Sequence, residues 1–89
     1  MAQSFVHDPE AVLDYTVDWG TWLDGDTIAT STWTVPTGVT EDSSTNTTTT
    51  ATIWVSGGTE GTSYDLVNHI VTAAAREDDR TITLVVQNK

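Results

Sequence analysis

Cysteine is missing from this sequence, basic residues are scarce, and no long apolar run occurs. Without cysteine the chain has no disulfide to stabilise it and no thiol to act as a nucleophile or soft metal ligand. No stretch approaches the roughly 20 apolar residues that a membrane-spanning helix needs. The first residues also lack the basic and apolar regions of a secretory signal peptide, so we expect synthesis in a cytoplasm.

Only three basic residues stand against thirteen acidic ones, which gives a formal net charge of −10. Nucleic acids and anionic membranes both attract Lys and Arg, so this balance argues against either as a partner. It suits a basic protein partner, a divalent cation, or simple solubility. The pairs Asp24/Asp26 and Asp78/Asp79 lie outside any twelve-residue calcium loop, and turn chemistry explains them.

No arrangement of residues typical of a catalytic or metal site is present in the sequence. His7 and His69 are far apart, and neither has a His or Cys nearby at metal-ligand spacing. No serine lies in a nucleophile-elbow motif, and no glycine-rich loop precedes a helical segment. We therefore expect a protein that is not an enzyme and that uses no cofactor or metal.

Alternating apolar and polar residues predict β-strands along most of the chain. In the first strand Leu13, Tyr15 and Val17 share one face. The predicted strands cover residues 13–19, 27–35, 47–55, 63–72 and 81–86. No segment has the period of a helix long enough for a βαβ unit. The spacing of the turns favours an all-β, immunoglobulin-like antiparallel sandwich of about seven strands, the shorter ones near residues 4–7 and 37–42.

Two parts of the predicted domain organisation lie outside the strong strands. Residues 1–10 lack periodicity and are expected to form an N-terminal arm, with the sandwich domain spanning 11–89. The arm is either frayed or laid across a neighbouring subunit, where Phe5 and Val6 are the candidate contacts. Residues 43–46 are expected at the exposed tip of a loop, and residues 76–79 in a hairpin turn.

Three aromatic residues are predicted to have structural roles. Trp19 and Trp33 fall on inward faces of their strands and are expected in the core. Tyr64 follows a glycine-rich turn and begins the penultimate strand. A tyrosine at that place in immunoglobulin-like sandwiches turns its hydroxyl back onto the backbone, and the alternative is an ordinary core tyrosine.

Trp54 and Trp22 are the candidate partner-binding tryptophans. Trp54 is out of phase with Ala51, Ile53 and Val55, so its side chain faces away from the core, and Trp22 lies near a turn. Three interpretations of Trp54 stay open: an anchor for a protein partner, a platform for stacking a sugar, or a cover over the edge of the sandwich.

The sequence resembles a family of short phage and prophage proteins described as fiber–tail adaptors. The matching segments are Asp8-Pro9, Val12-Leu13-Asp14-Tyr15, Asp18-Trp19, Gly25-Asp26-Thr27-Ile28, Ser31-Thr32-Trp33-Thr34-Val35-Pro36, Trp54 with Ser56-Gly57-Gly58-Thr59, Gly61-Thr62-Ser63-Tyr64 and Asp78-Asp79-Arg80-Thr81-Ile82. Together they cover nearly the whole chain in order. The chain departs from the family pattern at Ala74-Ala75 and in the Thr/Ser tract at 43–50.

This resemblance implies a non-enzymatic structural protein of a tailed-phage virion, placed in the neck or tail as an attachment point for fibers or other appendages. Its partners would be other phage structural proteins and copies of itself in a ring, with modest contacts strengthened by avidity. The alternatives are a carbohydrate-binding module and a head-decoration protein, both of the same sandwich class.

Overall fold

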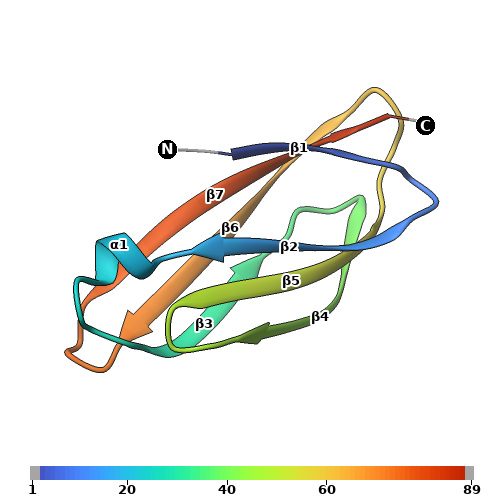
Figure 1. The fold of residues 1–89 in the computed structure, drawn as a ribbon. Coiled ribbons are helices and arrows are strands. Elements are labelled where there is room, and N and C mark those ends of the chain that lie inside the picture. Colours follow the sequence, from blue (N-terminus) through green and yellow to red (C-terminus); the bar gives the residue numbers. More distant parts are fainter. Residues whose placement is uncertain (1–2, 88–89) are drawn as a thin grey trace.

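The computed structural model describes residues 3–87, which form seven strands and a single helical turn. Figure 1 shows their arrangement along the chain. The elements are β1 (Gln3–His7), β2 (Val12–Asp18), α1 (Gly20–Leu23), β3 (Ile28–Thr34), β4 (Val39–Asn46), β5 (Thr50–Gly57), β6 (Ser63–Thr72) and β7 (Glu77–Val86). The strand predicted over 63–72 therefore has the bounds that alternation gave it.

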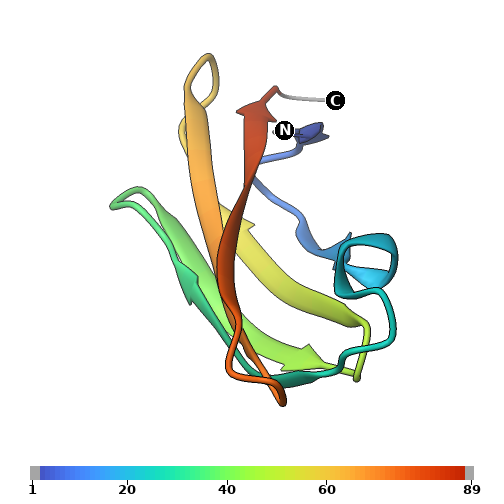
Figure 2. The same ribbon diagram turned by 90° about the vertical axis from the view of Figure 1, so that its left-hand side faces the viewer.

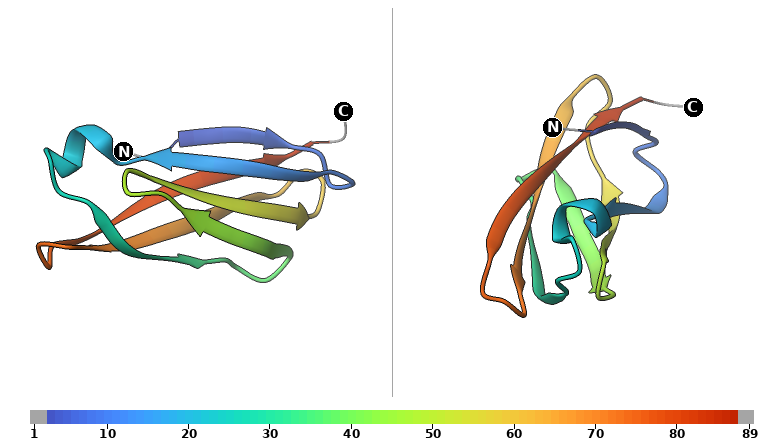
Figure 3. Two further views of the ribbon diagram at one scale, coloured as in Figure 1. Left: turned by 60° about the horizontal axis from the view of Figure 1, so that its bottom comes forward. Right: turned by 60° about the vertical axis from the view of Figure 1, so that its left-hand side comes forward.

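The strands form two sheets that pack face to face (Figures 2 and 3). One sheet has the order β1-β7-β6-β3 and the other the order β2-β5-β4. All neighbouring strands are antiparallel except β1, which runs parallel to β7. The predicted all-β, immunoglobulin-like sandwich is thus confirmed, with one parallel pair at the edge of the larger sheet.

The core lies between the inward faces that alternation predicts. On β5 the side chains of Ala51, Ile53 and Val55 are fully buried. On β7 the same holds for Leu84 and Val86. Because successive side chains of a strand point to opposite faces, one apolar phase per strand is enough to fill the space between two sheets.

The N-terminal segment belongs to the sandwich. We expected residues 1–10 to form an arm outside the sandwich, with a short strand near 4–7; Gln3–His7 do form a strand, β1, but it pairs with β7 from Ile82 to Val86 and so is part of the sandwich. The His7 side chain is buried, and its Nδ1 lies 2.6 Å from the Tyr15 hydroxyl. This contact joins the two sheets, and the short segment Gln3–His7 gives no sign of it in its sequence. Residues 1 and 2 of the expected arm lie outside the described residues.

The expected loop tip at 43–46 is wrong, because these residues are the second half of β4. The turn comes at 47–49, where the Thr47 hydroxyl accepts hydrogen bonds from the backbone N–H groups of Thr49 and Thr50. Strand β4 lies at the edge of its sheet and buries only Val39, so its residues have no apolar alternation. An edge strand of this kind is held by its backbone hydrogen bonds to β5, so its residues need no apolar alternation and periodicity cannot detect it.

The hairpin turn expected at 76–79 is also wrong, since β7 already begins at Glu77. The chain reverses one step earlier, with Ala75 in the left-handed region at φ 66°. The backbone N–H of Ala74 donates to the Asp26 carboxylate, and the N–H of Arg76 donates to the Thr72 hydroxyl. These contacts with other elements outweigh the cost of a left-handed alanine.

Candidate functional site

Trp54 lies on the outer face of the β2-β5-β4 sheet. Its neighbours Ile53 and Val55 are fully buried, whereas 40% of Trp54 is exposed. Asp14 of β2 stands directly opposite Trp54 on one side, and Ser43 of β4 stands opposite on the other. The outward orientation predicted from phase is therefore the one in the structure, with Trp54 on the central strand of its sheet.

The rest of this outer face is rich in hydroxyl groups. Thr16 of β2 stands opposite Thr52 of β5, and their hydroxyls lie 2.9 Å apart. Thr45 of β4 continues the same row. Cross-strand threonines of this kind stiffen a sheet face without adding charge. We call the face formed by Val12, Asp14, Thr16, Ser43, Thr45, Thr52 and Trp54 the Trp54 face.

All the large apolar side chains classed as exposed within residues 3–87 lie on three strands. They are Val6 on β1, Val12 and Leu13 on β2, and Trp54 on β5. Figures 1 and 3 show β1, β2 and β5 in succession, with β1 at the edge of the larger sheet and β2 and β5 in the smaller one. Val12 and Trp54 are both exposed on the Trp54 face, whereas Val6, out of phase with the inward Phe5 and His7, is exposed on the outer face of the other sheet. The Trp54 face, with a tryptophan at its centre, is therefore the candidate interaction surface.

Phe5 and Val6 have opposite orientations on β1. Phe5 is half-buried, packs against the core, and its ring centroid lies 5.1 Å from that of Tyr15. Val6 is 44% exposed. Of these two predicted partner-binding residues, only Val6 is exposed, while Phe5 packs between the sheets.

Trp22 lies in the helical turn α1 and is half-buried. The guanidinium carbon of Arg76 lies 4.4 Å from its ring centroid. Arg76 also donates to the Leu23 carbonyl at 2.7 Å and to the Asp26 carboxylate at 3.1 Å. Trp22 is thus engaged by a residue of its own chain through a cation–π contact.

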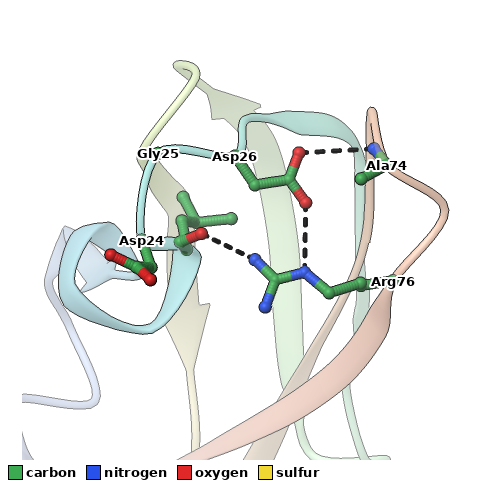
Figure 4. A pocket seen from close by; sticks show the side chains of 6 residues that line it. Asp24, Gly25, Asp26, Ala74 and Arg76 are labelled. Atoms are coloured by element: carbon green, nitrogen blue, oxygen red, sulfur yellow. Dashed lines mark hydrogen bonds and ion pairs between the residues drawn. The ribbon is translucent and has the colours of Figure 1, made fainter.

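A shallow, open depression of about 430 Å³ lies beside this contact (Figure 4). Figure 4 shows the Asp26 carboxylate between the backbone of Ala74 and the guanidinium of Arg76. Hydrogen bonds from Thr72 first, then from Thr27, Arg76 and Ala74, hold the pKa of Asp26 down at about 2. Asp26 and Arg76 are bonded to each other and to the neighbouring backbone, so these two residues connect α1 with the β6–β7 turn.

Trp19 is fully buried and connects the two sheets through its indole N–H. That group donates to the Asn68 side-chain oxygen at 2.9 Å. The Asn68 amide nitrogen donates in turn to the Ser31 hydroxyl and to the Thr32 carbonyl. Sequence reasoning did not single out Asn68, although its phase with Leu66 and Ile70 marks it as an inward polar residue.

Tyr64 and Trp33 are the other two residues with predicted structural roles. Tyr64 is buried, and its hydroxyl accepts a hydrogen bond from the backbone N–H of Thr59 at 3.0 Å. This is the geometry expected of a tyrosine corner, and it ties the β5–β6 loop to the start of β6. A Cβ at Gly38 would come within 2.7 Å of the Tyr64 ring, so the β3–β4 loop also depends on this tyrosine. Trp33 is half-buried and packs against the core cluster.

The exposed histidine, His69, lies between two carboxylates of β7. Its Nδ1 is 2.5 Å from Asp79 and its Nε2 is 3.0 Å from Glu77, so the two ring nitrogens point to different groups. Hydrogen bonds to Asp79 first and to Glu77 second raise the pKa of His69. Across residues 3–87, no three His, Cys, Asp or Glu side chains are grouped in a way that would hold a metal ion.

The described part of the chain contains no helix long and apolar enough to cross a membrane.

The fold defines the class first: a small immunoglobulin-like β-sandwich domain. A solved structure with a similar fold is the solution structure of the PKD domain from the KIAA 1837 protein, with a TM-score of 0.55 and 16% identity. That match covers 98% of this chain and 80% of the other. A sequence comparison with curated proteins gives no match.

The family follows from the sequence match. The family model described as "Podophage GP4 fiber-tail adaptor protein gp77" matches residues 7–85, and the chain belongs to this family. It is therefore a phage fiber-tail adaptor, a structural protein of the virion, and the expected family resemblance is confirmed.

Proposed function

We propose that this chain is a non-enzymatic adaptor in the neck or tail of a podophage virion, where several copies attach fibers or other appendages. Its partners are other tail or neck proteins and further copies of the chain arranged in a ring. Membership of the fiber-tail adaptor family supports the attachment role. Repetition around an axis would turn modest contacts per copy into firm attachment.

The observation that carries this proposal is the exposure of Trp54 in the middle of a sheet face. A tryptophan that is 40% exposed leaves a large apolar surface in water, and none of the core needs it there. Tryptophan is among the residues most enriched at the energetic centre of protein interfaces. Val12, exposed on β2, extends the same face.

The four predicted partner-binding residues take different parts in this proposal. Val6 and Trp54 make direct contacts with partners, because both are exposed, Trp54 on the Trp54 face and Val6 on the outer face of β1 in the other sheet. Phe5 supports β1 from the core side, where it packs against Tyr15. Trp22, stacked under Arg76, belongs to a second and smaller contact at the α1 end.

The contacts of the two histidines support a non-enzymatic role. His7 is buried against the Tyr15 hydroxyl, and His69 is held between two carboxylates.

The test is the composition of purified particles. Phage carrying wild-type, Trp54→Ala or Thr30→Ala adaptor would be compared by quantitative mass spectrometry and electron microscopy. We expect many ordered copies per wild-type particle, a marked loss of adaptor or appendages for Trp54→Ala, and no loss for Thr30→Ala, an exposed position on the other sheet.

Two results would count against the proposal at different levels. Wild-type particles without the protein would exclude the virion role altogether. Trp54→Ala particles with a full complement of adaptor and appendages would leave the virion role standing and exclude the Trp54 face as the contact. Circular dichroism of each purified variant establishes that it folds.

A further inference from the structure

Both arginines of this chain lie over the face of a tryptophan. Arg76 stacks on Trp22 at 4.4 Å, with the Asp26 carboxylate 3.1 Å from its Nε. The contact thus combines an aromatic face with a carboxylate, and the guanidinium uses both. A planar guanidinium is suited to this, because it stacks with its face and donates hydrogen bonds with its edge.

The second arginine follows the same plan with a carbonyl as acceptor. The guanidinium carbon of Arg80 lies 4.4 Å from the Trp19 ring centroid. Its Nη1 donates to the backbone carbonyl of Asp18 at 2.8 Å. These contacts join β7 to the end of β2, so both arginines are committed to holding the fold together.

Trp54 and Asp14 present the same two components on the outer surface. They occupy directly opposed positions on β5 and β2, and both side chains are exposed on the same face. Side chains opposed across an antiparallel pair have Cβ atoms about 5 Å apart, close enough for one guanidinium to contact both. The arginines of the chain are already placed at Trp19 and Trp22.

We infer that Trp54 and Asp14 form a binding site for an arginine side chain of a partner protein. The inference rests on the proposed adaptor function and specifies the chemistry of its contact. Charge supports this partner: the chain carries a formal net charge of −10, and Arg76 is paired with its own carboxylate. A basic protein surface complements this field and gains specificity from it.

Arginine fits this site better than lysine does. Lysine offers a compact, strongly hydrated charge, whereas the guanidinium offers a flat face to Trp54 and a fork of N–H donors to Asp14. The neighbouring Thr16 and Thr52 side chains are short and bonded to each other, and 40% of Trp54 is exposed beside them. The site is therefore expected to bind arginine more tightly than lysine, a difference that charge attraction alone would not produce.

The experiment uses the isolated full-length chain labelled with ¹⁵N and the peptide acetyl-Gly-Arg-Gly-amide as probe. Spectra record the four tryptophan indole signals and the backbone signals during titration. We expect saturable shifts at the Trp54 indole and the Asp14 amide. Binding of the matching lysine peptide should be about two- to fivefold weaker, and that of the uncharged citrulline peptide weaker still.

Three variants make the assignment specific. Asp14→Asn should weaken the arginine peptide about two- to fivefold, and Trp54→Leu should abolish saturable binding. Asp78→Asn removes the same charge from β7 in the other sheet and keeps an oxygen for the Asp79 N–H, so it should bind like wild type.

Equal shifts with arginine and citrulline peptides, or unchanged binding by Asp14→Asn, would overturn the inference. Saturable binding of a soluble oligosaccharide at Trp54 in place of the arginine peptide would overturn it in favour of a sugar platform. These measurements need no virion, so they are independent of the particle composition that tests the adaptor function. Retained amide dispersion shows that each variant is folded.

Discussion

Replacing Asn68 tests how much its buried side-chain hydrogen bonds stabilise the fold. Its oxygen accepts from the Trp19 indole N–H at 2.9 Å, and its nitrogen donates to Ser31 and Thr32. Asn68→Leu keeps the branching and the number of side-chain heavy atoms, so no cavity is created. It leaves the indole N–H buried without an acceptor, because Trp19 and Asn68 are both fully shielded from solvent.

The expected cost is worked from that indole group. A buried donor without a partner costs about 1–3 kcal/mol, and the Thr32 carbonyl loses one of its partners as well. We expect a loss of about 2–3 kcal/mol of unfolding free energy, out of a total on the order of 5–10 kcal/mol for a domain of this size. The midpoint temperature should fall by roughly 10–20 °C.

The assay is thermal and urea unfolding followed by circular dichroism, arranged as a double-mutant cycle with Trp19→Phe. Phenylalanine has no N–H to leave unpaired, so Asn68→Leu should cost about 1–2 kcal/mol less in that background. Ser31→Ala serves as the control, since Ser31 is half-exposed and water replaces its role; its effect should stay within about 0.5 kcal/mol. An equal cost of Asn68→Leu in both backgrounds would refute the reasoning.

Three further predictions concern groups at the two ends of the sandwich. Tyr64→Phe should lower the unfolding free energy by about 1 kcal/mol, measured by urea titration, because the Thr59 N–H loses its acceptor; an unchanged midpoint would argue against this bond. Asp26 has a pKa of about 2, below its ordinary 3.8, so its stabilisation is present above pH 3.8 and is lost as the pH falls through 2. The wild-type advantage in midpoint temperature over Asp26→Asn should therefore shrink over that interval, and a constant difference would contradict the assignment. His69 has a raised pKa, so its stabilisation is complete below its ordinary 6.5 and is lost as the pH rises through the folded-state value; imidazole NMR titration and the loss of this dependence in His69→Gln check it.

The sequence alone determined the strands that bury one face. Alternation is a property of a single strand, so the run Tyr64, Leu66, Ile70 shows both that β6 exists and which side is inward. The same local rule placed Trp54 outward, and the excess of acidic residues follows from composition. Tyr64 was predictable because its corner is formed by a turn five residues away.

Tertiary structure alone decided the contacts that join distant segments. The indole of Trp19 meets a partner 49 residues later, and Arg80 reaches a carbonyl 62 residues before it. The edge strands β1 and β4 are defined by backbone ladders to β7 and β5, which leave no apolar period in their own residues. The β6–β7 turn lies at Ala75 because Asp26, far along the chain, binds the adjacent N–H of Ala74. Such pairings exist only in the folded chain. For the same reason the sequence could not predict that Asp14 and Trp54 stand opposite each other on β2 and β5.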